Sequence, residues 1–541
     1  MAVLLAVMAI LYLFALGNHG LLEPDEGRYS EIPREMLESG DFVTPRLNYV
    51  AYFEKPILHY WLTASSFALL GQNEFAARLW PALLALAGIA VTYWLTANMK
   101  GPRAGFFSGW ILGTSLVYFA IGQINITDMP LSFFMTLSMA GFWFGIQKDK
   151  KFFLLFYAGM ALATLTKGLI GIVLPAGVIF WWIVLMNRWK TVGESLYMPG
   201  IALFFLLTVP WFLLVSLRNA DFFHFFFIQE HFLRYTTRIH DRFEPWWWFI
   251  PILLVGLIPW TGFLPGAMAR AFPRKGRNRG NGSGLFLLLW FGVIFVFFSI
   301  SSSKLVPYIV PALPPLAILM GSFLDELASP SSRKSLARSL AASTAILLPF
   351  ATALSAYPFF EERYGLMALP YALPVTAVLA TLTGASWYFY AKTEPNRVVL
   401  AFCLLALLHT AVFKNAFGLY DQILTSRDLA HYLAAEVRTG DVVAQYREYD
   451  QSLPFYLERR IVLVDYLGEL EFGALREDNT HWFLDSDRFI ERYWKSPERV
   501  LLILREEQPL DFLEESGVPP HKIFDTPRRT VVTNMKKEAL K

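Results

Sequence analysis

The sequence predicts a multi-span α-helical membrane protein that ends in a small α/β domain. Of its 541 residues, 55% are hydrophobic and only 17% are charged, whereas soluble domains carry about 25% charged residues. The mean hydropathy is +0.42, and the 48 Phe, 23 Tyr and 17 Trp suit lipid-facing surfaces and interfacial rings. A net charge of +3 is too small to indicate nucleic-acid binding.

About thirteen apolar segments approach the length needed to cross a hydrocarbon core roughly 30 Å thick. The first could be interpreted as a secretory signal peptide. It lacks a basic start and a small-residue cleavage site before His19, so we expect it to be the first spanning helix. The predicted spans fall near residues 1–17, 75–97, 103–121, 129–147, 152–166, 169–186, 198–217, 247–266, 284–300, 305–323, 339–358, 370–391 and 398–415.

The charges of the short loops predict the orientation. If the N-terminus is cytoplasmic, every loop on that side is basic, as the positive-inside rule requires. An odd number of spans then places the C-terminal region on the opposite side. The basic residues of these inner loops are Lys100, Arg103, Lys148, Lys150, Lys151, Arg188, Lys190, Arg270, Arg274, Lys275, Arg277, Arg279, Arg333, Lys334, Arg338, Lys392 and Arg397.

Beyond residue 419 the apolar runs stop, and short predicted strands alternate with helices, which is typical of an α/β domain. We therefore expect a transmembrane domain, 1–419, with a long first outer loop, 18–74, followed by an α/β domain, 420–541. No glycine-rich phosphate-binding pattern occurs in this domain, and a lid or support role is expected. The predicted strands are 441–446, 460–466, 499–505 and 530–535, and the predicted helices are 426–438 and 485–495.

The first outer loop is dense with charge. It contains E-P-D-E-G-R-Y from Glu23 and Y-F-E-K-P from Tyr52. Segments 30–37 and 57–70 have the composition of helices that lie along a membrane interface. The alternative is a solvated loop with surface salt bridges, and composition does not separate the two.

Two further places carry candidate polar chemistry at the outer interface. Asp128 lies in T-D-M-P after the third span, where it either caps the next helix or faces a cavity, because an unpaired charge facing lipid is costly. The segment 301–308, S-S-S-K-L-V-P-Y, offers hydroxyls, an ammonium and a phenol that could bind a phosphate. The alternative for Lys304 is a lysine that snorkels to the interface.

A metal site is a third possibility. The loop after residue 218 contains Glu230, His231 and His240, and Glu54 lies in the first loop. Imidazole and carboxylate groups suit zinc or a similar ion. Their spacing does not distinguish metal ligands from hydrogen-bonded interfacial histidines.

Taken together, several segments resemble the ArnT branch of the membrane glycosyltransferases that use polyprenyl-phosphate sugars. These enzymes are relatives of the protein O-mannosyltransferases and share their multi-span GT-C-type fold. The resemblance covers the chain to about residue 420, and the tail matches in placement and size. One departure is Ile57, where the family usually has a second proline after Lys55-Pro56. The matching segments are E-P-D-E-G-R-Y, Y-F-E-K-P, T-D-M-P, L-T-K-G and S-S-S-K-L-V-P-Y-I-V-P.

The resemblance implies a pentosyltransferase of the bacterial inner membrane. It would transfer 4-amino-4-deoxy-L-arabinose from undecaprenyl phosphate to a lipid A phosphate on the periplasmic face, modifying lipopolysaccharide and conferring resistance to polymyxin and cationic antimicrobial peptides. Transfer of another sugar to a lipid or protein stays open, because no motif recognises a 4-amino group. A lipid-sugar transporter is a less favoured alternative, since transporters often show repeated halves and mid-membrane charges.

The same resemblance implies roles for individual residues. Asp25 and Asp128 would be the essential acids, and Glu54 with His231 would hold a zinc-like divalent metal. Whether an aspartate removes a proton or only positions a substrate stays open, because a lipid A phosphate is already largely ionised near neutral pH. The residues implied to hold the carrier phosphate are Lys55, Arg234, Lys304 and Tyr308.

Overall fold

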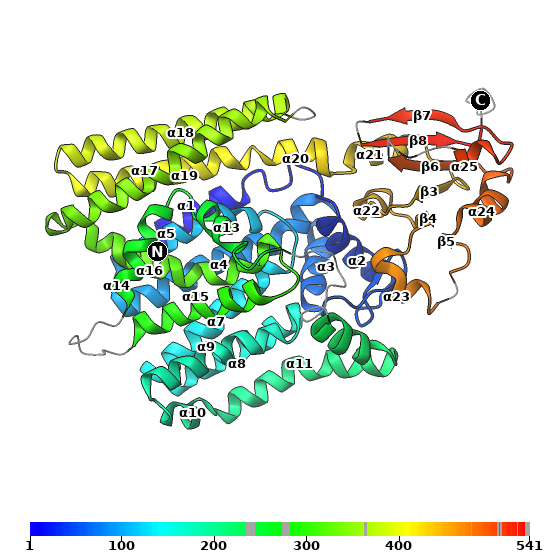
Figure 1. Cartoon of the computed structure of the whole chain (residues 1–541). Coiled ribbons are helices and arrows are strands. Elements are labelled where there is room, and N and C mark those ends of the chain that lie inside the picture. The colour runs from blue at the N-terminus through cyan, green and yellow to red at the C-terminus, as the bar shows by residue number, and fades with distance from the viewer. Residues whose placement is uncertain are drawn as a thin grey trace. The chain divides into compact units, whose positions relative to one another are not determined.

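The computed structural model divides into two compact units (Figure 1). It describes residues 1–233, 244–272, 282–361, 365–477, 479–505, 508, 511–526 and 528–535. Most of the first outer loop groups with the C-terminal residues rather than with the helices that flank it. Unit 1 comprises Met1–Leu16, Glu54–His59 and Arg78–Leu419, and unit 2 comprises Gly17–Phe53, Tyr60–Ala77 and Tyr420–Lys541.

Unit 1 is a multi-span bundle of apolar helices. Within the described residues, eight helices are long and apolar enough to cross a membrane, or nine if the bent pair α13–α14 is one span. Its long helices are α4 (Glu74–Lys100), α7 (Asp128–Gln147), α11 (Met198–Arg218), α15 (Ser283–Ile300), η4 with α16 (Val306–Ala312, Leu313–Leu327), α17 (Arg333–Ala356), α18 (Gly365–Ala391) and α19 (Pro395–Lys414). Its shorter helices include α1 (Ala2–Leu13), α5 (Pro102–Gly113), α6 (Leu116–Ile121), α8 (Phe153–Lys167), α9 (Ile170–Met186), α13 (Phe249–Gly256) and η3 with α14 (Thr261–Phe263, Leu264–Ala271).

Each predicted span corresponds to helical structure, but not every one is a full-length span. The segment predicted at 103–121 is split into α5 and α6, and the segment at 247–266 bends by 111° between α13 and the η3–α14 turn. Helices α1, α8 and α9 contain 12, 15 and 17 residues, respectively. The structure therefore shows a multi-span helical membrane protein, and the count of thirteen spans stays a prediction.

Small residues allow neighbouring helices of unit 1 to pack closely. A Cβ added at Gly141 of α7 would lie 2.4 Å from the backbone nitrogen of Phe156 on α8. A Cβ at Gly159 of α8 would lie 2.7 Å from the backbone oxygen of Phe134 on α7. Such small-residue contacts are typical of helix pairs in membranes. The hydrophobic effect does not drive association there, so close packing of the two backbones stabilises the pair instead. This packing places the N-terminus of α7 beside the C-terminus of α8.

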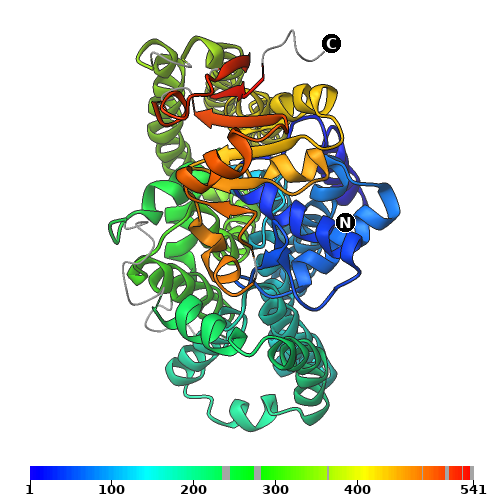
Figure 2. The ribbon, with the colours of Figure 1, turned by 90° about the vertical axis from the view of Figure 1, so that its right-hand side faces the viewer.

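Unit 2 contains a six-stranded mixed sheet, coloured orange to red in Figures 1 and 2. The strand order is β5-β4-β3-β6-β8-β7, in which β5, β4, β3 and β6 are parallel and β8 is antiparallel to both β6 and β7. The strands are β3 (Val442–Tyr446), β4 (Val462–Val464), β5 (Phe483–Leu484), β6 (Val500–Arg505), β7 (His521–Asp525) and β8 (Arg529–Thr533). The predicted α/β domain is confirmed.

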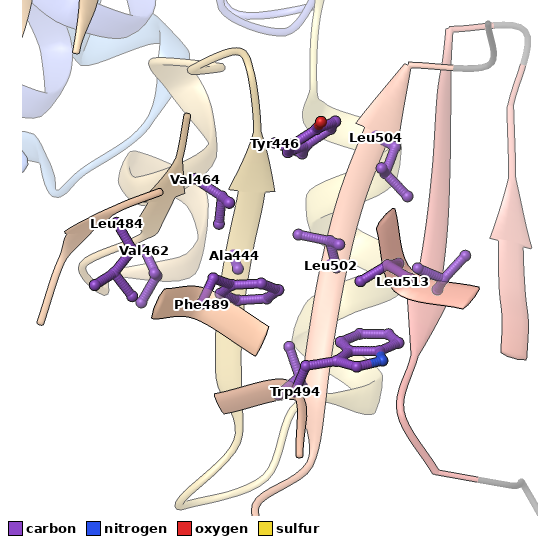
Figure 3. Packing of buried hydrophobic residues seen from close by; sticks show 12 residues of the cluster. Ala444, Tyr446, Val462, Val464, Leu484, Phe489, Trp494, Leu502, Leu504 and Leu513 are labelled. Atoms are coloured by element: carbon purple, nitrogen blue, oxygen red, sulfur yellow. The ribbon is translucent and has the colours of Figure 1, made fainter. Parts of the chain in front are cut away.

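The core of this sheet follows from its register. Ala444 pairs with Val462 on one side and with Leu502 on the other, and Leu502 pairs with Val532. Residues in register lie on the same face of a sheet, and all four are buried in one apolar cluster. Trp494 belongs to the same cluster, and Figure 3 shows it at the lower end of the cluster. The helices that precede or connect these strands are α21 (Arg427–Glu436), α22 (Ser452–Leu457), η7 (Gly468–Leu470), α23 (Glu471–Ala474), α24 (Ser486–Phe489), η8 (Ile490–Trp494) and α25 (Asp511–Glu514).

The first outer loop folds into α2 (Asp25–Ser39), β1 (Arg46–Leu47), β2 (Val50–Ala51) and α3 (Leu58–Leu70). The predicted helix at 30–37 is thus longer than expected. Arg28, Glu31 and Arg34 on α2 are 5%, 0% and 3% exposed. The alternative of a solvated loop is therefore wrong, because these charged side chains are buried and paired inside unit 2.

Candidate active site

A buried ion pair connects α7 and α8 in unit 1. Asp128 is the first residue of α7, and its Oδ1 lies 2.6 Å from Nζ of Lys167 at the end of α8. Both side chains are only 8% exposed. The Lys167 ammonium also lies 4.5 Å from the ring centroid of Tyr308. Lys167 therefore contacts both Asp128 and Tyr308. The sequence had singled out Asp128 and Tyr308 but had given Lys167 no role.

The geometry decides between the two interpretations of Asp128. Thr127 occupies the N-cap position of α7, and no side-chain cap hydrogen bond is formed there. The helix-cap interpretation of Asp128 is therefore wrong. A carboxylate in the first turn also interacts favourably with the positive end of the helix dipole. Burial of this charge beside Lys167 fits a polar cavity lining rather than a lipid-facing surface.

Lys304 precedes η4 and is held inside the protein. Its Nζ donates to the backbone oxygens of Ser301, at 2.6 Å, and Glu244, at 2.7 Å. The residue is only 5% exposed, so the alternative of a snorkelling lysine is wrong. Burial lowers the pKa of Lys304, and the charge of Glu244 opposes this shift only in part. An anion such as a phosphate would stabilise the charged form.

Lys55 and Glu54 form a second polar segment of unit 1. Lys55 Nζ lies 3.7 Å from Glu54 Oε2, and the two side chains are 14% and 12% exposed. Burial lowers the pKa of the nearby His59 to about 3, and the neighbouring side chain of Asn125 opposes this shift only in part. Asn125 lies three residues before Asp128. The neutral imidazole therefore lies close to the segment that leads into α7.

Asp25 belongs to unit 2. It opens α2, its side chain is 53% exposed, and its Oδ1 lies 3.4 Å from Nη2 of Arg28. Arg28 is itself held by the C-terminal part of the unit. Its Nη1 lies 2.8 Å from Glu469 Oε2, and its Nε donates to Gln451 Oε1 at 3.0 Å. Sequence reasoning missed both partners, because they lie more than 400 residues from Arg28.

Other acids of the loop hold unit 2 together. Glu31 pairs with Arg34 at 2.7 Å. Burial and the charge of Glu31 raise the pKa of Glu35 well above its ordinary value. Glu23 accepts hydrogen bonds from the backbone nitrogens of Gln451 and Ser452, each at 2.9 Å. Its carboxyl therefore binds the N-terminus of α22.

Part of the expected site, which follows α11 in the sequence, lies outside the described residues. Arg234 and His240 lie outside them. The backbone of His231 belongs to the π-helix η2 (His224–Leu233), which also contains Glu230, but the His231 side chain is not described. Within the described residues, no three His, Cys, Asp or Glu side chains gather in metal-binding geometry. Glu54, placed beside an ammonium, does not make a metal site by itself.

Comparison with known proteins shows the family of this chain. Residues 1–226 match the family described as dolichyl-phosphate-mannose-protein mannosyltransferase, and residues 429–534 match the aminoarabinose transferase C-terminal domain. An undecaprenyl phosphate-alpha-4-amino-4-deoxy-L-arabinose arabinosyl transferase of Pseudomonas paraeruginosa is 31% identical, over 86% of this chain and 89% of that protein. The chain belongs to the ArnT family. The resemblance seen in its motifs is therefore confirmed, and it is a membrane glycosyltransferase.

Further ArnT relatives cover nearly the whole chain. The enzyme of the same name from Erwinia tasmaniensis is 29% identical over 95% of both chains. A crystal structure of ArnT from Cupriavidus metallidurans, bound to undecaprenyl phosphate, superposes with a TM-score of 0.83. It is 30% identical and covers 99% of this chain and 98% of that one. An archaeal oligosaccharyltransferase shares only the fold, with a TM-score of 0.50 at 10% identity.

Proposed function

We propose that this enzyme transfers 4-amino-4-deoxy-L-arabinose from undecaprenyl phosphate to a phosphate of lipid A. The observation that carries the proposal is the likeness, along almost the whole chain, to an ArnT that binds undecaprenyl phosphate. The names of the curated relatives support the same carrier and sugar. The lipid A acceptor, and the resulting resistance to polymyxin, are proposed on the family resemblance.

We also propose that the chain crosses the bacterial inner membrane thirteen times, with the active site and unit 2 on the periplasmic side. In the part of the chain that the structure describes, nine candidate spans exist if the bent pair counts once. The four remaining predicted spans are the shorter helices α1, α8 and α9 and the broken pair α5–α6. Flanking side chains that snorkel, or local thinning of the bilayer, let shorter helices span. The basic inner loops support the orientation.

Topology reporters test this orientation. A reporter that is active only in the cytoplasm should give a signal when fused after Arg279, in a segment rich in arginine and lysine. The same reporter should give no signal when fused after Lys541, where a reporter that is active only in the periplasm should give one. Equal signals from the two fusions would contradict the proposed orientation.

The carrier phosphate is proposed to bind where Lys55, Arg234, Lys304 and Tyr308 lie. Lys304 and Tyr308 come from one short segment, and Lys167 lies over the Tyr308 ring. When the bond between the anomeric carbon and the carrier phosphate breaks, negative charge grows on the departing phosphate. Cations in a partly dry site stabilise that charge more than they would in water. This differential stabilisation would lower the barrier to transfer.

The acceptor is proposed to be a phosphate oxygen of lipid A. This oxygen attacks the anomeric carbon and forms the new C–O bond, while the bond from that carbon to the carrier phosphate breaks. Undecaprenyl phosphate is the second product. Because this acceptor is already ionised, Asp25 and Asp128 would act mainly by positioning the acceptor and stabilising positive charge on the sugar. For a hydroxyl acceptor, an aspartate would serve as general base instead. A zinc-like metal held by Glu54 and His231 stays a prediction, and no step above depends on it.

A reconstituted assay tests the proposed reaction. Purified full-length enzyme in lipid vesicles should consume undecaprenyl-phosphate aminoarabinose and release one undecaprenyl phosphate for each lipid A modified. The matched control is lipid A without its phosphates, which should not react. Equal rates on the two acceptors, or transfer only to a hydroxyl or a protein, would contradict the proposed acceptor and favour the O-mannosyltransferase-like alternative.

A further inference from the structure

Arg28 stands between Asp25 and the C-terminal part of unit 2. Its side chain is 6% exposed, while that of Asp25 is 53% exposed and that of Glu469 is 17% exposed. Nη1 contacts Glu469 at 2.8 Å and donates to the Tyr52 hydroxyl at 2.9 Å. Nε donates to Gln451 at 3.0 Å. The Nη2 atom lies 3.4 Å from Asp25.

A guanidinium group is planar, and its five N–H donors are fixed relative to one another. Once Nε and Nη1 are bound, the direction of Nη2 is set as well. Asp25 lies one turn before Arg28 on the same helix, so Nη2 reaches the carboxylate of the residue three positions earlier. The exposed carboxylate therefore receives its orientation from a buried cation.

We infer that Glu469 and Gln451 are positioning residues, which fix Arg28 and through it the carboxylate of Asp25 for sugar transfer. This inference rests on the proposed role of Asp25 in the reaction. It gives the C-terminal domain a function in the chemistry: the domain supplies the acid and the amide that orient the first turn of α2.

The two positioning residues are themselves held in place. Gln451 is the N-cap residue of α22 and is 2% exposed. Its backbone nitrogen donates to Glu23, two residues before Asp25, at 2.9 Å. Glu469 lies in η7, and its Oε2 also accepts from the Tyr52 hydroxyl at 3.2 Å. The backbone of Gln451 and the side chain of Glu469 are thus held by further hydrogen bonds, as a positioning role requires.

The chain offers a matched control for a general loss of loop attachment. Arg46 lies in the same outer loop and pairs with Glu477 of the C-terminal part at 2.9 Å. These two side chains are 33% and 32% exposed, and Arg46 lies on β1 rather than on α2. Glu477→Gln therefore removes an ion pair between the same two parts of unit 2 without touching Arg28.

The test compares Glu469→Gln with Glu477→Gln in the purified full-length enzyme. For Glu469→Gln we expect kcat, per folded enzyme, to fall by about tenfold or more, because a misplaced reacting group costs of that order. The KM for the undecaprenyl-phosphate sugar should stay within about twofold, since the carrier is proposed to bind elsewhere. Glu477→Gln should leave kcat within about twofold. Glu469→Asp, which restores the charge, should recover part of the lost kcat.

Several results would overturn the inference. One is an unchanged kcat in Glu469→Gln, and another is an equal loss of kcat in Glu469→Gln and Glu477→Gln. A lowered melting temperature with normal kcat per folded enzyme would show a purely structural role. Asp25→Asn separates the proposed role of Asp25 from the positioning role of Glu469. If Asp25→Asn keeps normal transfer, the proposed role of Asp25 fails together with this inference. If Asp25→Asn is inactive while Glu469→Gln is normal, only this inference fails.

Discussion

Replacing Asp128 with Asn is expected to lower the rate of sugar transfer by about two to three decades, the range typical for loss of one group that stabilises charge in the transition state. Asn has nearly the same size and still offers an oxygen to Lys167, so a less stable protein should still insert and fold in part. The measurement is kcat of the purified variant, with the folded fraction checked by its melting temperature. Asp25→Asn should have a comparable effect.

Lys167→Gln separates a catalytic Asp128 from a merely structural ion pair. The two side chains form one buried pair at 2.6 Å, so a structural role would make the two single variants equivalent. Removing either partner of a buried pair leaves the other uncompensated, which costs about 3–5 kcal/mol of stability. If Asp128 acts on the substrate, Asp128→Asn should lower kcat well below that of Lys167→Gln. Equal losses would assign Asp128 a structural role.

Lys55→Ala is expected to lower catalytic efficiency about 2- to 30-fold more than Tyr308→Phe. A charged hydrogen bond to the carrier phosphate contributes roughly 1.5–3 kcal/mol, and a neutral one about 1 kcal/mol. Lys55→Arg should not restore full activity, because a planar guanidinium does not replace a compact ammonium. The measurement is kcat/KM with a short-chain polyprenyl-phosphate sugar.

One outcome would place the phosphate away from Lys55. If Lys55→Ala transferred sugar at the normal rate, with an unchanged dependence on donor concentration, the lysine would have no part in carrier binding. Lys304→Ala then becomes the informative variant. Lys304 is 5% exposed and its ammonium is held by two backbone carbonyls, so the loss of activity in Lys304→Ala would be the larger one if the phosphate lies beside η4.

Hydropathy predicted the helices of unit 1 well, because a spanning segment must satisfy its own backbone and present apolar side chains to lipid. The predicted span at 129–147, for example, is α7 (Asp128–Gln147). The break between α5 and α6 was not predicted, since Gly113 and Thr114 do not interrupt the apolar pattern strongly. Periodicity also located β3, β4, β6 and β8. It missed β5, which has only two residues, and the polar edge strand β7.

The site was less predictable, because its contacts join residues far apart in the sequence. The charges of α2 indicated a solvated loop as readily as a site, and only the fold shows that Glu31 and Arg34 are buried together. Lys167 was visible in L-T-K-G, but its pairing with Asp128 depends on the close packing of α7 and α8. Glu469 and Gln451 carry no sequence signal for a contact with Arg28.

Mass analysis of lipid A tests most directly whether the enzyme transfers aminoarabinose to lipid A. Lipid A would be compared from cells carrying the wild-type gene, the Asp128→Asn gene or no gene. We expect lipid A species heavier by one aminoarabinose unit only with the wild-type gene. Identical lipid A in all three strains, with a sugar found instead on a protein or another lipid, would contradict the account.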